Sequence, residues 1–164
     1  FRSMLLLLLF APLCWATLEE PELTFERLYQ FGKEAYRDKR WEDCIGFMKK
    51  SLEDYDYYTS EVEACAARCL KKLPLPVFGS DVDTEYYRFA LMHHTSERAL
   101  CVMRCRRQRL SSRRPLIYRR EIVHDFLERR PFNYLQLCYW KDDNFESAAR
   151  AAYTYLVANP TSEE

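Results

Sequence analysis

Glycine is scarce in this sequence, with three residues among 164, whereas tyrosine and phenylalanine number twelve and ten. A chain with so little glycine lacks the turn residues that a β sandwich needs at its many hairpins. It also contains no glycine-rich phosphate loop and no motif for an activated nucleophile. Because the hydrophobic residues recur at spacings of three and four, the sequence predicts an all-α protein of one domain, or at most two small ones.

The sequence also lacks a hydrophobic run that is long enough to cross a membrane. The apolar run 4–10 follows Arg2 and precedes Pro12, and it is far shorter than the roughly 20 residues of a membrane helix. Cys14 and Ala16 place small residues where a signal peptidase reads, so residues 1–16 are predicted to be a cleaved secretory signal. The chain begins with phenylalanine and stops just after Asn159-Pro160, so we expect residues 17–164 to belong to a longer protein.

Net charge is absent as well, because 25 lysines and arginines balance 25 aspartates and glutamates. The overall charge therefore points to no nucleic-acid partner. One stretch without acidic residues is nevertheless basic, and its arginines are Arg104, Arg106, Arg107, Arg109, Arg113, Arg114, Arg119 and Arg120. A nucleic-acid surface is one interpretation, but the secretory signal argues against it, and we expect a solvated, partly mobile basic loop.

Two segments have the pattern of a helical hairpin. In the first, residues 24–37 and 41–55 carry apolar stripes on either side of the connection 38–40, and Thr24 is placed to cap the first helix. The layout returns after a shift of 104 residues, which brings Tyr36 onto Trp140 and Trp41 onto Phe145. These are the features of tetratricopeptide-like helical pairs, although two separated units do not make a regular array.

The stretch between the two hairpins is predicted to be a helical insert. Residues 60–70 form a short helix, and the following segment 71–83 breaks it with two prolines and a glycine. A longer helix runs over 84–107, a basic loop over 111–115, and a further helix over 120–130 that Pro131 stops.

The two inserted helices each carry a Cys-x-x-x-Cys pair. The pairs are Cys65/Cys69 and Cys101/Cys105. A spacing of four places both thiols of a pair on one helix face, and bonding within a pair would strain the helix. If the two helices pack antiparallel, the register that fits joins Cys65 to Cys105 and Cys69 to Cys101. Zinc is the alternative, but an oxidising compartment favours disulfides.

Cys44 and Cys138 occupy inward positions of the two hairpins. We interpret them as small core residues that are not bonded, because free cysteine behaves as a small hydrophobic residue. A disulfide between them is the less favoured alternative.

Several segments together carry a resemblance to a known family. They are the hairpin 28–55, the cysteine segments 63–69 and 99–105, and the stretches 125–136 and 148–160. With the signal, they resemble the N-terminal helical half of the leprecan family, which comprises collagen prolyl 3-hydroxylases and non-catalytic relatives. The resemblance implies residence in the endoplasmic reticulum lumen, with procollagen chains and other subunits of a prolyl 3-hydroxylation complex as partners. The short apolar run itself predicts no membrane span after signal cleavage.

The resemblance leaves two related roles open. The chain is either a scaffold that helps collagen prolyl 3-hydroxylation and procollagen folding by binding, or the non-catalytic front part of a hydroxylase. An iron and 2-oxoglutarate dioxygenase needs a His-x-Asp/Glu pair and a distant histidine, whereas His93 and His94 are adjacent and His124 directly precedes Asp125. We therefore expect no catalytic residue, metal ligand or cofactor here. A generic secreted helical-repeat adaptor is the third possibility.

The tyrosines at the end of the first hairpin are a further candidate for binding. Tyr55, Tyr57 and Tyr58 alternate with acidic residues in this segment. Aromatic surfaces suit extended proline-rich chains, so one interpretation is a contact surface for such a chain. The other is ordinary packing at a helix end.

Overall fold

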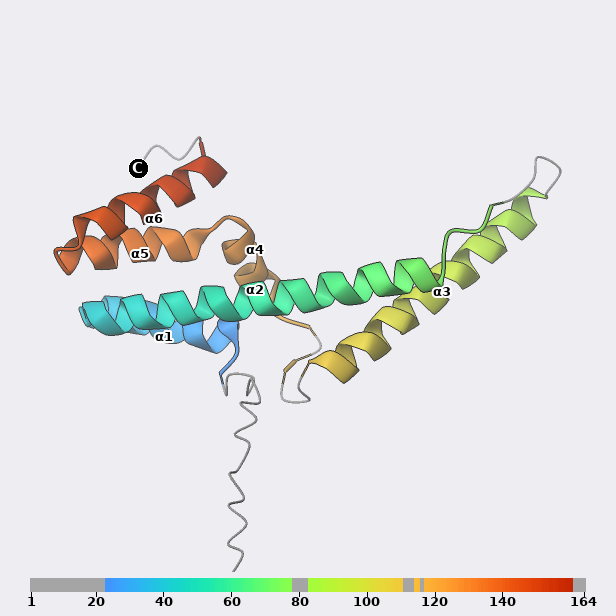
Figure 1. The fold of residues 1–164 in the computed structure, drawn as a ribbon, viewed down its shortest axis with the longest axis horizontal. Coiled ribbons are helices and arrows are strands. Elements are labelled where there is room, and N and C mark those ends of the chain that lie inside the picture. The colour runs from blue at the N-terminus through green and yellow to red at the C-terminus, as the bar shows by residue number, and fades with distance from the viewer. Residues whose placement is uncertain (1–22, 78–82, 111–113, 116, 161–164) are drawn as a thin grey trace, which may run out of the picture.

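The protein is all-α, as the sequence predicts, in a computed structural model that describes residues 23–77, 83–110, 114–115 and 117–160. The predicted signal, residues 1–16, lies outside these ranges. The helices are α1 (Phe25–Arg37), α2 (Trp41–Lys72), α3 (Thr84–Arg109), α4 (Arg120–Leu127), α5 (Arg130–Lys141) and α6 (Phe145–Ala158) (Figure 1). Within the described ranges, no helix is both long and apolar enough to span a bilayer.

The helices α1 and α2, and likewise α5 and α6, form the two predicted hairpins. Their turns repeat residue for residue, because Lys39 has a φ of 60° and Asp143, 104 positions later, has a φ of 56°. In both turns the next residue donates its N–H to the carbonyl five positions earlier, at 2.9 Å. A side chain in this left-handed region costs energy, so the shared geometry reflects the closure of the hairpin and not local preference. The predicted repeat is confirmed at the level of the backbone.

The expected break in α2 is wrong. The sequence predicts one helix to about residue 55 and another over 60–70, but a single helix of 32 residues covers both. The polar residues between them do not end it, because their hydroxyls bond carbonyls of the preceding turn. Thr59 Oγ1 donates to the carbonyl of Tyr55 at 3.0 Å, and Ser60 Oγ donates to that of Tyr57 at 2.8 Å. The long helix therefore belongs to both the first hairpin and the cysteine-rich insert.

The core of the body is aromatic and centres on Phe25, the first residue of α1, which is fully buried. Its ring contacts Tyr55 and Tyr58 of α2, Tyr118 and Phe126, with centroid distances between 4.3 and 5.6 Å. These partners come from α2, the segment before α4, and α4 itself. The cluster thus ties the chain that returns from α3 to the first hairpin.

A buried ion pair replaces the expected cap of α1. Thr24 is at the capping position, as predicted, but its side chain makes no capping bond. Instead Asp54 Oδ2, from α2, accepts the N–H of Phe25 at 2.7 Å. Arg114 Nη1 donates to the same oxygen at 3.0 Å, and Arg114 Nη2 donates to Asp54 Oδ1. The carboxylate thereby satisfies an N–H at the positive end of α1 and neutralises a buried guanidinium.

Burial of tyrosines leads to a testable alkaline transition. Burial raises the pKa of Tyr29, Tyr55, Tyr118 and Tyr134 above the ordinary value of about 10. Because the folded pKa is raised, these groups contribute stability that is present below pH of about 10 and lost as the pH rises above it. We expect absorbance at 295 nm to show a set of tyrosines that ionise only as near-ultraviolet circular dichroism is lost. Full ionisation of all tyrosines with the dichroism intact would contradict this burial.

Candidate partner-binding groove

The cysteine-rich insert is held by two disulfides between α2 and α3. Cys65 is bonded to Cys105 and Cys69 to Cys101, with Cα–Cα distances of 5.7 and 5.9 Å. This is the register expected for antiparallel helices, so the two bonds form adjacent rungs. The zinc interpretation of these four residues is wrong, because their sulfurs are bonded to one another.

A third disulfide, between Cys44 and Cys138, corrects the interpretation of these two residues as unbonded. Their Cα atoms lie 6.4 Å apart, and both side chains are fully buried. The bond joins α2 to α5 and so fixes the first hairpin against the second. Helical periodicity indicates that both residues point inward, but it does not indicate which inward positions of two distant helices face each other.

Three arginines after Cys105 bond side chains of α2 and do not lie in a solvated loop, whereas residues 111–113 of the expected loop lie outside the described ranges. Arg106 Nη2 donates to the Tyr58 hydroxyl at 2.7 Å, and Arg109 Nη2 donates to Glu61 at 3.0 Å. Together with the Arg114 pair, these contacts fasten the returning chain to the side of α2. The Arg109 guanidinium also holds the pKa of the Glu61 carboxyl below its ordinary value. Three arginines of the basic stretch therefore bond side chains of α2, two through ion pairs and one through a hydrogen bond.

The tyrosines near the middle of α2 mainly have a packing role. Tyr55 and Tyr58 lie against Phe25 in the aromatic core, and Asp54 between α1 and Arg114 is buried. Tyr57 is more exposed, and the Arg114 guanidinium lies 5.6 Å from the centre of its ring. Two of the three rings proposed for contact with an extended chain are thus used inside the fold.

The histidines do not gather into a metal site. Among the described residues, no group of three or more histidine, cysteine, aspartate or glutamate side chains is arranged to hold a metal ion. His94 Nε2 lies 2.8 Å from the carbonyl oxygen of Pro74, which places this residue against the chain that follows α2. His93 is exposed beside Glu97 of α3, and His124 is exposed beside Glu128, the residue that follows α4.

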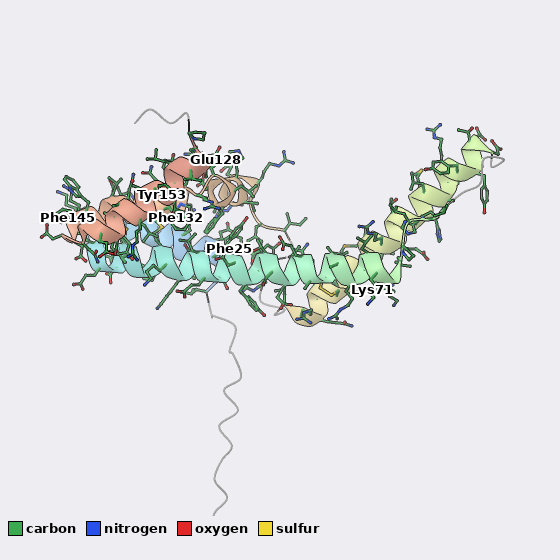
Figure 2. The ribbon with its side chains drawn as sticks, turned by 45° about the horizontal axis from the view of Figure 1, so that its top comes forward. Phe25, Lys71, Glu128, Phe132, Phe145 and Tyr153 are labelled. Carbon is green, nitrogen blue, oxygen red and sulfur yellow. A yellow bond between two sulfur atoms is a disulfide. The ribbon has the colours of Figure 1, made fainter. Side chains whose placement is uncertain are left out.

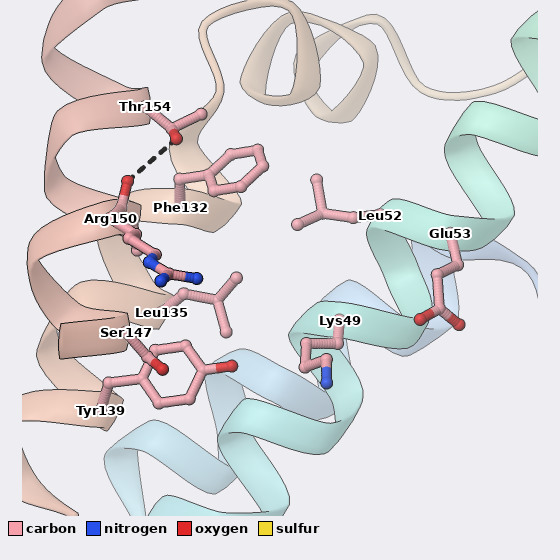
Figure 3. A pocket seen from close by; sticks show the side chains of 10 residues that line it. Lys49, Leu52, Glu53, Phe132, Leu135, Tyr139, Ser147, Arg150 and Thr154 are labelled. Carbon is pink, nitrogen blue, oxygen red and sulfur yellow. Dashed lines mark hydrogen bonds between the residues drawn. The ribbon is translucent and has the colours of Figure 1, made fainter. Parts of the chain in front are cut away.

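The hollow best suited to a partner lies between the two hairpins (Figure 3). It has a volume of about 390 Å³, within the range of ligand pockets. We call it the hairpin groove, and it is lined by Lys49, Leu52 and Glu53 of α2, Phe132, Leu135 and Tyr139 of α5, and Ser147, Arg150, Ala151 and Thr154 of α6. The two hairpins therefore build it jointly, and the Cys44–Cys138 bond holds them together.

The hairpin groove combines an apolar floor with a charged rim. Leu135 and Ala151 are buried at the floor, while Lys49, Glu53 and Arg150 are exposed at the edges. Arg150 is paired with Glu146 one turn earlier on α6. An apolar floor with both signs of charge around it suits a polypeptide segment better than a simple anion.

The sequence alone does not mark the residues of the hairpin groove. The repeat pattern predicts paired hairpins but assigns no side chains to a groove between them. A signal was present, because Ser147, Arg150, Ala151 and Thr154 follow a spacing of three, four and seven along α6. That stripe mixes polar and small residues, so the pattern alone did not distinguish a groove from an exposed helix face.

Comparisons with known proteins agree with this architecture. The family described as "Leprecan family TPR-like repeat region" matches residues 24–164. The chain is 28% identical to cartilage-associated protein of Gallus gallus, over 86% of this chain and 51% of that protein. It is 32% identical to prolyl 3-hydroxylase 2 of Mus musculus, over 88% of this chain and 20% of that protein. It is 28% identical to endoplasmic reticulum protein SC65 of Homo sapiens, over 82% of this chain and 31% of that protein.

The chain thus spans about half the length, or less, of these curated relatives. The family match covers the whole region in which the structure describes helices. Its tetratricopeptide-like character agrees with the two hairpins and their repeated turns. The chain therefore belongs to the leprecan family.

Proposed function

We propose that this chain is a protein-interaction domain of the endoplasmic reticulum that helps collagen prolyl 3-hydroxylation and procollagen folding by binding. The observation that carries the proposal is the hairpin groove, built by two disulfide-joined hairpins in a chain of the leprecan family. The names of the relatives, cartilage-associated protein and endoplasmic reticulum protein SC65, support this setting. Cleavage of a signal at residues 1–16 would deliver the chain to that compartment.

In this proposal the chain acts by binding its partner and not by catalysing a reaction. Phe132, Tyr139 and Leu52 offer apolar contact along the groove, and Lys49 and Glu53 offer charged contacts at its rim. An unfolded procollagen segment lying there would be held near the other subunits of a hydroxylation complex. Three disulfides keep the hairpins and the insert pre-organised, which lowers the ordering cost of binding.

Blocking the hairpin groove tests this proposal. Ser147 is half-buried in the groove and is not a core residue. Ser147→Trp should therefore fill the hollow and leave the core side chains in place. We expect binding of procollagen and of hydroxylase subunits to fall about ten-fold or more in a non-reducing pull-down quantified by mass spectrometry.

The matched control is Ala149→Trp, which adds the same ring to an exposed position of α6 outside the groove. It should bind like the original chain, and circular dichroism should show both variants folded. Undiminished procollagen binding by Ser147→Trp would refute the groove as the binding site. Absence of every collagen-pathway partner from the unmodified chain would leave the generic adaptor.

The second candidate is that the chain is the non-catalytic front part of a prolyl 3-hydroxylase. The 32% identity to prolyl 3-hydroxylase 2 favours it. The two candidates share this domain and differ in what the parent protein carries beyond it. The coding sequence downstream of Glu164 decides between them, because a dioxygenase domain there would make the parent an enzyme.

A further inference from the structure

The helix α3 has two different faces. One face packs inward, where Cys101 and Cys105 are bonded to α2 and His94 lies against the carbonyl oxygen of Pro74. The N-terminal half of α3 extends beyond the end of α2, away from the other helices, in both views of the chain (Figures 1 and 2). On the opposite face of α3, large side chains in both halves of the helix are exposed.

This opposite face is apolar and exposed. Its large side chains follow helical spacing and are exposed by 64% at Tyr86, 77% at Phe89, 68% at Met92, 46% at Leu100 and 50% at Met103. Together with Ser96, which lies on the same side, these residues form what we call the α3 outer face. Five large apolar side chains in one row exceed the scattered exposure of an ordinary surface and indicate an interaction site.

The α3 outer face is complementary to itself. Met92 and Leu100 each lie four residues from Ser96, and Phe89 and Met103 each lie seven residues from it. In an antiparallel pair of α3 helices centred on Ser96, Met92 would meet Leu100 of the second copy and Phe89 would meet its Met103. The small Ser96 side chain, which donates to the carbonyl of Met92 at 2.9 Å, would allow a close approach at the centre.

The charges at the two ends fit the same arrangement. Glu85 lies in the first turn of α3 and Arg107 in the last, each eleven residues from Ser96. Antiparallel pairing would bring Glu85 of each copy to Arg107 of the other. A parallel pair would instead place like charges together. The apolar row alone would suit many proteins, but the charges and the symmetry about Ser96 favour a second copy of this chain.

We propose that the α3 outer face is a homodimer interface, in which two α3 helices pack antiparallel about a two-fold axis at Ser96. Such an interface is isologous, so each contact occurs twice. A single pair of helices buries a small area, and we expect a dissociation constant on the order of 1–100 µM. The interface is separate from the hairpin groove and does not depend on collagen binding.

The first test is sedimentation velocity of the disulfide-bonded chain over this concentration range. Met92→Glu with Leu100→Glu should weaken the dimer about 100-fold, because four charges would meet at its centre. Ala64→Glu with Ala67→Glu adds the same charges to exposed positions of α2 and should leave the dimer unchanged. Circular dichroism and peptide mapping of the disulfides should show every variant folded.

Charge reversal then tests the antiparallel arrangement. Glu85→Arg alone and Arg107→Glu alone should each weaken the dimer about five-fold, whereas the double variant should recover to within about two-fold of the original. Ser96→Cys should give a covalent dimer on mild oxidation, because a residue on the axis faces its own copy. The neighbouring exposed Thr95→Cys, turned about 100° around the helix, should not.

Three results would overturn the proposal. The chain could remain monomeric at about 500 µM, above the expected range. Charge reversal in the double variant could fail to restore association. A different protein could bind the α3 outer face while the isolated chain stays monomeric, which would assign the surface to another partner.

Discussion

Asp54→Ala is expected to lower the free energy of unfolding by about 3–5 kcal/mol, because it removes the buried carboxylate that forms an ion pair with the Arg114 guanidinium. The two side chains are only 1% and 4% exposed, so water cannot replace the lost partner. The substitution also removes the acceptor of the Phe25 N–H at the start of α1. Urea unfolding of the disulfide-bonded chain measures the loss.

Two further variants separate burial of charge from other effects. Glu146→Ala removes the exposed ion pair with Arg150 and should change the free energy of unfolding by less than about 0.5 kcal/mol. Asp54→Asn with Arg114→Met removes both buried charges but keeps an oxygen for the Phe25 N–H, so it should cost less than Asp54→Ala. If the double variant is the less stable of the two, loss of the buried ion pair is not the main cause of the destabilisation.

Replacing both Cys44 and Cys138 by alanine should lower the free energy of unfolding by about 4 kcal/mol. The bond closes a loop of 94 residues. With the other two disulfides intact, the chain between its ends still contains about 54 free residues, and restricting that loop in the unfolded chain accounts for the effect. Non-reducing urea unfolding gives the value, with peptide mapping to show that the remaining bonds are correct.

The two rungs should behave differently from this bond. Removing Cys65–Cys105 alone should cost only about 2.5 kcal/mol, because Cys69–Cys101 still closes nearly the same loop. Removing both rungs should lower the free energy of unfolding by more than the sum of the two single losses. Each single loss is measured while the other rung still closes the loop. A single rung that costs as much as Cys44–Cys138 would contradict this account.

Sequence patterns predicted the parts of the fold that local periodicity governs. The hairpins follow from apolar stripes on both sides of short turns, and the shift of 104 residues located equivalent positions such as Tyr36 and Trp140. The pairing of the two rungs could be predicted for a related reason. When each of two antiparallel helices carries two cysteines one helical turn apart, a single register pairs all four.

Contacts between side chains that are distant in the sequence could not be predicted from local patterns. Asp54 and Arg114 are 60 residues apart, and nothing in either local pattern marks them as partners. The same is true of Cys44 and Cys138, whose inward positions are evident but whose pairing depends on how two hairpins pack. The hairpin groove is a property of that packing as well, so its lining could be assigned only from the structure.

The unbroken helix α2 has a mechanical consequence. Its 32 residues make a rod of about 48 Å, with the hairpin groove near its first half and the bonded α3 near its last. No proline interrupts it, so the separation and angle between groove and α3 are set by a stiff element and not by a linker. Two copies joined through α3 would therefore display two grooves at a fixed spacing. A long flexible chain could engage both at once and gain avidity without any tighter contact in either groove.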